Sequence, residues 1–146
     1  MDYYQAYQLG HNWLLKNPHP GKRDAIMFDI DDTLLLVNWG TSNLVLTPNQ
    51  PIIQLLKEFH TAGYHIYIIT ARDFRVRNET MDDLKNNGIP FHELHMRYTH
   101  SDQHFKSDLK RELSKKGIRF VMSVGDQPID VEGEYSGIPI KLVSRI

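Results

Sequence analysis

Short apolar runs alternate along the chain with segments in which apolar residues recur every three or four positions. The runs cover residues 25–28, 65–70, 93–96, 118–124 and 139–143. Each has the length of a strand, and helical patterns lie between them, as in a parallel sheet with crossover helices. The sequence therefore predicts an α/β fold with the run 25–28 near the centre of the sheet.

Start and stop residues support two helices in the first half of the chain. Pro51 lies in the first turn of a predicted helix over 51–61, and Gly63 follows its end. A second helix over about 78–87 is ended by Gly88. In both segments the helical spacing of apolar residues stops just before the glycine, as expected for a helix that ends there.

Two further helices are predicted from the spacing of apolar residues. Ser101 could cap a helix that Gly117 ends, with Phe105, Leu109 and Leu113 on one face. The stretch up to about residue 16 places Tyr3, Tyr7 and Leu14 on one helical face, so we expect it to pack on the core.

Reactive side chains follow three of the predicted strands. Asp29, Asp31 and Thr33 follow the first run, Thr70 and Arg72 end the second, and Gly125, Asp126 and Asp130 follow the fourth; Lys106 lies on the helix between. Ligands of open α/β sheets bind beyond the carboxyl ends of the strands, so these residues are expected to share one pocket.

Four carboxylates in one pocket repel each other unless a cation neutralises them. An all-oxygen ligand set favours a hard divalent cation, and an incomplete protein cage favours Mg²⁺. Asp29 is then placed to attack phosphorus, while Asp31 can protonate the leaving oxygen and later accept a proton from water. Thr70 and Lys106 can stabilise charge on the phosphoryl oxygens.

The composition of the chain excludes several kinds of site. The 146 residues suit one domain, the formal net charge is −1, and no cysteine is present, which excludes disulfides, thiolate metal sites and a cysteine nucleophile. No basic flank followed by an apolar run opens the sequence, and no run reaches membrane-spanning length. We therefore expect a cytoplasmic protein without a membrane partner.

The segment Phe28-Asp29-Ile30-Asp31-Asp32-Thr33-Leu34 resembles the first signature of phosphatases of the haloacid dehalogenase (HAD) superfamily. Thr70, Lys106 and the G-D-x-x-x-D pattern of residues 125–130 match the other three signatures in order. The resemblance implies a Rossmann-like sheet with helices on both faces. It also implies that Asp29 is the nucleophile.

The same resemblance implies a ligand set for the metal. Asp29 would bind Mg²⁺ through its side chain, Asp31 through its backbone carbonyl, and Asp126 as the third protein ligand. Asp130 would bind directly or orient a metal-bound water. Asp31 also favours hydrolysis, since transport ATPases of the superfamily carry Thr there and the dehalogenases lack that Asp.

Residues 68–72, followed by Arg77, Thr80, Leu84 and Gly88, resemble the acid phosphatase branch (subfamily III) and the phosphatase domains of polynucleotide kinases. Those relatives act on nucleotides, other small phosphomonoesters or 3′-phosphate ends. These are the substrates that the resemblance implies.

No insertion is long enough for a cap domain. Residues 34–50 have room for a flap, so we expect an open site that takes a nucleic-acid end, a phosphorylated small molecule or a phosphoprotein, or that a second copy covers. Thr33, Arg72 and Trp39 are the candidates for substrate binding. Trp39 could stack on a base or simply anchor the flap.

Two alternatives remain open at this stage. His92, His95, His100 and His104 are dense enough for a transition-metal site, although exposed side chains explain them too. A non-catalytic module that binds phosphate and Mg²⁺ is the alternative to an enzyme.

Overall fold

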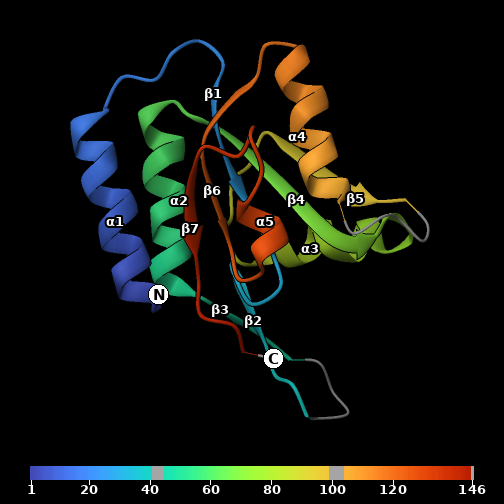
Figure 1. The fold of residues 1–146 in the computed structure, drawn as a ribbon. Coiled ribbons are helices and arrows are strands. Elements are labelled where there is room, and N and C mark those ends of the chain that lie inside the picture. Colours follow the sequence, from blue (N-terminus) through green and yellow to red (C-terminus); the bar gives the residue numbers. More distant parts are fainter. Residues whose placement is uncertain (41–44, 99–103, 146) are drawn as a thin grey trace.

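The computed structural model describes residues 1–40, 45–98 and 104–145 and places five parallel strands in one sheet, ordered β5-β4-β1-β6-β7 (Figure 1). The strands are β1 (Asp24–Phe28), β4 (His65–Asp73), β5 (Glu93–Arg97), β6 (Arg119–Gly125) and β7 (Ile138–Lys141). The helices are α1 (Tyr3–Lys16), α2 (Gln50–Ala62), α3 (Arg77–Asn86), α4 (Phe105–Lys115) and α5 (Pro128–Val131), with a 3₁₀ turn, η1 (Phe74–Val76), before α3. The predicted α/β fold with a parallel sheet is confirmed, and the predicted strands and helices are present.

The central strand, β1, is buried on both faces of the sheet. Its side chains alternate, so Ile26 and Phe28 enter one core while Ala25 and Met27 enter the other. A strand that is covered on both faces has no polar side, which explains the continuous apolar run in the sequence. This burial fixes the position at which Asp29 leaves the sheet.

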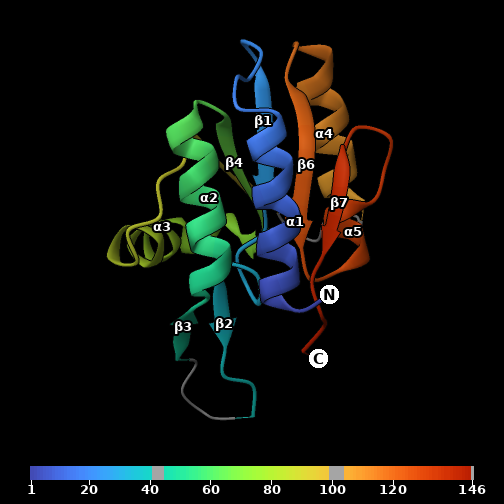
Figure 2. The ribbon, with the colours of Figure 1, turned by 90° about the vertical axis from the view of Figure 1, so that its left-hand side faces the viewer.

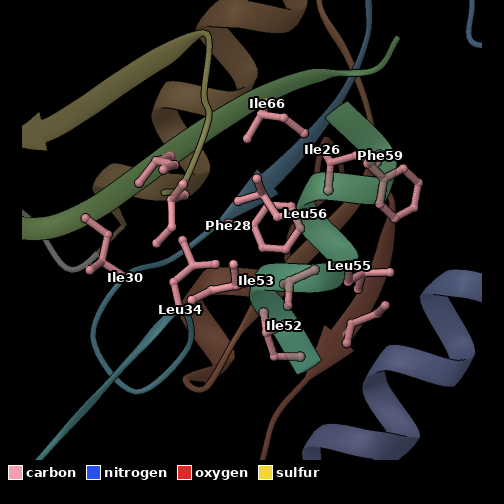
Figure 3. Close-up of a cluster of buried hydrophobic side chains, with 14 of the residues drawn as sticks. Ile26, Phe28, Ile30, Leu34, Ile52, Ile53, Leu55, Leu56, Phe59 and Ile66 are labelled. Atoms are coloured by element: carbon pink, nitrogen blue, oxygen red, sulfur yellow. The ribbon is translucent and has the colours of Figure 1, made fainter. Parts of the chain in front are cut away.

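Helices cover the two faces of the sheet separately (Figure 2). On one face, Ile52, Leu56 and Phe59 of α2 join the core that contains Ile26 and Phe28 of β1 (Figure 3), and α1 packs beside α2. On the other face, α4 contributes Leu113 to the core around Met27. None of the helices in the described parts of the chain is long and apolar enough to cross a membrane.

The helix ends follow the predicted signals where the structure describes them. Gly63 ends α2 in the left-handed conformation, with φ of 100°, and its N–H donates to the carbonyls of Phe59 and His60. Ser101, the predicted cap of the helix before β6, lies outside the described residues, and α4 begins at Phe105.

The chain between β1 and α2 forms the flap. Its strands β2 (Leu35–Val37) and β3 (Leu46–Pro48) pair antiparallel and extend from the end of the sheet where β1 finishes (Figure 1). Asp32 anchors this hairpin: its carboxylate accepts hydrogen bonds from Val37 N, Trp39 Nε1 and Arg145 Nη1. Asp32 has a φ of 59°, which Asp adopts more readily than most residues.

Candidate active site

An acidic cleft of about 150 Å³ lies beyond the carboxyl ends of β1, β4 and β6. Seven of the nine predicted site residues line it: Asp29, Asp31, Trp39, Thr70, Lys106, Asp126 and Asp130. Trp39 lies between β2 and β3, and the other six come from three strand ends and from the first turns of α4 and α5, elements that are far apart in sequence. The sheet brings them together because parallel strands end at the same edge.

Three of the carboxylates converge at the floor of this cleft. One side-chain oxygen from each of Asp29, Asp126 and Asp130 lies within 4.8 Å of the others, and all three residues are buried. Such a group of oxygens could hold a divalent metal ion. The structure thus provides an acidic triad of the kind that the sequence predicts.

Lys106 places a positive charge against two of these carboxylates. Its Nζ donates to Asp29 Oδ1 at 2.8 Å and to Asp130 Oδ1 at 2.5 Å, and its side chain is almost fully buried. Burial acts to lower the pKa of Lys106, but the charges of Asp29 and Asp130 outweigh it and raise that pKa. Lys106 therefore stays positively charged inside the protein.

For Asp29, in contrast, burial has the larger effect and favours the uncharged form. Burial raises the pKa of its carboxyl well above the usual value, and the Lys106 ammonium only partly opposes this, since Asp130 and Asp126 add negative charge nearby. A cation held by the triad would favour the ionised form of Asp29, which is the form that can act as a nucleophile.

The loop after β6 is shaped around Asp130. Gly125 has no side chain, and a Cβ at that position would overlap the side chain of Asp130. Asp130 Oδ2 accepts a hydrogen bond from Gln127 N, and Gln127 Nε2 donates to Asp126 Oδ2 at 3.0 Å. Gln127 thus holds both carboxylates, a role that the sequence analysis did not assign to it.

Asp31 is not part of the acidic triad and forms an ion pair with Arg72. Arg72 Nε donates to Asp31 Oδ2 at 3.0 Å and Nη2 donates to Oδ1 at 2.8 Å. Burial acts to lower the pKa of Arg72, but its hydrogen bonds and charge interactions with Asp31 and Asp83 raise it above the usual value.

The remaining predicted residues lie at different depths. Thr70 Oγ1 accepts from Arg72 N, so its own hydroxyl hydrogen can donate into the cleft. Thr33 is fully buried and donates to Asp126 Oδ1 at 3.5 Å, and it does not line the cleft. Trp39 binds Asp32 through its indole nitrogen while 48% of the residue remains exposed.

A second buried lysine was missed by the sequence analysis. Lys110, one helical turn after Lys106, donates to Ser123 Oγ, Ser136 Oγ and the carbonyl of Asp130. Burial lowers its pKa to about 7, with Asp130 opposing the shift. The available signal was the four-residue spacing from Lys106, which places both lysines on one face of the helix.

The predicted histidine cluster is not a ligand set among the described residues. His95 binds Glu93, while His92 stacks on His65 with ring centroids 4.8 Å apart. His92 Nδ1 accepts a hydrogen bond from Ile66 N. His100 lies outside the described residues, and the groups of described His, Asp and Glu that could hold a metal comprise the acidic triad alone.

A larger cavity adjoins the acidic cleft. It has a volume of about 440 Å³ and shares Asp31 and Trp39 with the cleft. Val37, Leu46 and Val76 give it apolar walls, and Arg72, Asp73 and Asp83 lie at its polar side. A group bound in this cavity would lie next to Asp31 and outside the acidic triad.

The chain matches one family model over most of its length. The model describes the HAD superfamily, subfamily IIIB (acid phosphatase), and matches residues 39–145, which is 107 of the 146 residues. The match includes Thr70, Lys106, Asp126 and Asp130, and it begins after Asp29 and Asp31.

Similar proteins include phosphatases. Acid phosphatase 1 of Solanum lycopersicum is 27% identical over 141 residues, covering 76% of this chain and 53% of that protein. The crystal structure of a class C acid phosphatase from Bacillus anthracis with tungstate bound superposes with a TM-score of 0.67 at 23% identity, covering 88% of this chain and 62% of that one.

A chain of the Pnkp1/Rnl/Hen1 RNA repair complex shares the fold as well. Its TM-score is 0.60 at 21% identity, and the match covers 82% of this chain and 43% of that one. The chain described here thus spans about half the length of its curated relative and less than two thirds of these structural relatives.

Proposed function

The chain belongs to the acid phosphatase subfamily IIIB of the HAD superfamily, and from this premise we propose that it hydrolyses phosphate monoesters through a covalent phosphate on Asp29. The observation that carries the proposal is the convergence of Asp29, Asp126 and Asp130 within 4.8 Å, with the Lys106 ammonium against two of them. A carboxylate that a neighbouring ammonium and a bound cation would keep ionised is suited to attack a phosphoryl group.

The donor atoms of the triad fit a hard divalent cation, because all of them are carboxylate oxygens. We propose that Asp29, Asp126 and Asp130 hold Mg²⁺, with the Asp31 backbone carbonyl as a further ligand. Bound there, the ion would neutralise the carboxylates and polarise the phosphoryl group.

In the first step, a carboxylate oxygen of Asp29 attacks phosphorus. The new O–P bond forms as the bond between phosphorus and the leaving oxygen breaks, and Asp31 gives its proton to that oxygen. Thr70 donates a hydrogen bond to a phosphoryl oxygen, and Lys106 supplies positive charge where negative charge increases.

In the second step, water attacks the phosphorus of the aspartyl phosphate. Asp31, now ionised, takes a proton from this water, and the bond between phosphorus and the Asp29 oxygen breaks. Inorganic phosphate leaves, Asp29 is again a carboxylate and Asp31 again carries a proton. The same group thus acts as acid and then as base.

We propose that the leaving group occupies the 440 Å³ cavity beside Asp31. Its apolar walls and the exposed Trp39 suit a nucleotide or another phosphomonoester with a flat or apolar part. A polynucleotide 3′-phosphate end is a further candidate, in line with the fold likeness to a chain of an RNA repair complex. A phosphoprotein is a third, and a second copy of the chain could cover the open site. Arg72, which lines this cavity, remains a candidate for contact with the substrate, whereas the fully buried Thr33 does not.

Replacing the nucleophile tests this proposal. Asp29→Asn should lower Mg²⁺-dependent hydrolysis of p-nitrophenyl phosphate by at least about a thousandfold, because an amide oxygen does not attack phosphorus effectively. A chelator should remove the wild-type activity, and added Mg²⁺ should restore it.

Asp108→Asn is the matched control. Asp108 is a partly exposed carboxylate in the first turn of α4 that pairs with Arg111, outside the cleft. This variant should keep the wild-type rate. Wild-type turnover in Asp29→Asn would contradict the proposed role, and binding of phosphate without any turnover of the wild type would favour the non-catalytic module.

A further inference from the structure

The guanidinium of Arg72 is held on both sides by protein groups. Beyond the two hydrogen bonds to Asp31, its Nη1 donates to Asp83 Oδ2 at 2.9 Å and to Thr80 Oγ1 at 3.2 Å. All three of its nitrogens are therefore engaged. Only 15% of the Arg72 side chain is exposed, compared with 37% of the Asp31 side chain.

Both partners of Arg72 on the far side from Asp31 lie on α3. Thr80 is fully buried, and its hydroxyl donates to the carbonyl of Val76 at 2.8 Å. Asp83 lies one turn later on the same helix. The orientation of Arg72 is thus set by α3, and a planar guanidinium that binds both oxygens of a carboxylate fixes the plane of that carboxylate.

We infer that Arg72 is a positioning residue, which aims the Asp31 carboxyl at the leaving oxygen. This inference rests on the proposed function and concerns the group that transfers the proton. Asp31 lines both the acidic cleft and the adjoining cavity, so its carboxyl lies where the bond to the leaving group breaks. A partly exposed Asp without Arg72 would sample other rotamers and lose this direction.

The inference predicts a loss that depends on the leaving group. An alkoxide is a poor leaving group and needs a proton as the P–O bond breaks, whereas p-nitrophenolate leaves without one. Misplacing Asp31 should therefore slow the hydrolysis of alkyl phosphates far more than that of p-nitrophenyl phosphate. A purely structural defect, or a lost contact with the phosphate, would slow both alike.

The experiment compares two substrates of similar size, 4-nitrobenzyl phosphate and p-nitrophenyl phosphate. For Arg72→Ala we expect kcat/KM to fall by about 100-fold on the benzyl ester and by less than about tenfold on the phenyl ester. Asp31→Asn should show the same selectivity. The double variant should be no slower than Asp31→Asn alone, because the two residues act as one unit.

Three further variants separate geometry from charge and from folding. Arg72→Lys keeps the positive charge but not the two-pronged contact, so it should resemble Arg72→Ala. Asp83→Asn, which leaves Arg72 in place, should give a smaller loss with the same selectivity. Arg111→Ala is the control, because Arg111 is 49% exposed on α4 and pairs with Asp108, outside both the cleft and the adjoining cavity.

The outcomes are distinct. Equal losses on both substrates in Arg72→Lys and Asp83→Asn, or additive losses in the double variant, would overturn the inference. If the wild type hydrolyses neither substrate with Mg²⁺, the proposed function itself fails. Activity of the wild type together with unselective variants would remove this inference alone.

Discussion

Lys106 and Lys110 carry their ammonium groups into the interior from adjacent turns of α4. Lys106 meets two carboxylates, while Lys110 meets two hydroxyls and one carbonyl. Burial opposes the charged form of both lysines. The two carboxylates beside Lys106 outweigh burial and raise its pKa, whereas the neutral partners of Lys110 do not, and its pKa falls to about 7. Two lysines of one helix face therefore differ in their charge near neutral pH.

The low pKa of Lys110 predicts a dependence of stability on pH. Between about pH 7 and the usual lysine pKa of about 10.4, the unfolded chain binds more protons than the folded one, so stability rises with pH. Wild type should therefore gain stability relative to Lys110→Met as the pH increases from 7 to 9.5. At pH 9, Lys110→Met should be less stable by about 1–3 kcal/mol, since buried acceptors lose the hydrogen-bond donor that the amine supplies. Urea denaturation at several pH values measures this, and parallel curves for the two proteins would refute it.

At the scale of elements, histidine rings from different elements pack together near β5, at the edge of the sheet. His60 at the end of α2 and His65 at the start of β4 lie against the ring of His92. The ring of His92 accepts a hydrogen bond from Ile66 N, which requires Nδ1 without a proton. Burial, together with the two other imidazoles, lowers the pKa of His92.

Acid should weaken this edge. Since the pKa of His92 is lower in the folded chain than in the unfolded one, stability falls as the pH drops below about 6.5, the usual value for histidine. His92→Asn keeps an acceptor near the position of Nδ1 but does not titrate. The decrease in Tm between pH 7.5 and 5.5 should be smaller in His92→Asn than in wild type. The protection factor of the Ile66 amide, which corrects for slower intrinsic exchange in acid, should decrease as the pH falls in wild type. An equal decrease in Tm for both proteins would argue against this role.

The sequence predicted the positions of the strands more accurately than it predicted which face of a helix is buried. Strand positions follow from continuous apolar runs, which a sheet covered on both sides requires. For α4, the apolar spacing of Phe105, Leu109 and Leu113 predicted the buried face, whereas Lys106 and Lys110 are more deeply buried than Phe105 and Leu109. Lysine is buried here because carboxylates and hydroxyls from other elements reach it, and such partners cannot be read from the helix alone.

At the scale of the whole molecule, the candidate site depends on the sheet topology. β1 and β6 are neighbours in the sheet although their paired residues, such as Asp24 and Arg119, are 95 positions apart, so Asp29 and Asp126 meet. The order of motifs along the chain allowed this part of the site to be predicted. The pairing of Arg72 with both Asp31 and Asp83 could not be predicted, because it depends on side-chain rotamers and on how α3 packs.

Attachment of phosphate to Asp29 during turnover would test the proposed mechanism most directly. In Asp31→Asn, p-nitrophenyl phosphate can still transfer its phosphoryl group without a proton donor, but the base for the second step is missing, so the intermediate should accumulate. The reaction with Mg²⁺ is quenched in acid, and mass spectrometry locates the added phosphate. We predict phosphate on the peptide that contains Asp29, dependent on Mg²⁺ and absent from Asp29→Asn/Asp31→Asn. Turnover by wild type with no phosphate on Asp29 in the Asp31→Asn protein, or with phosphate on another residue, would contradict the account.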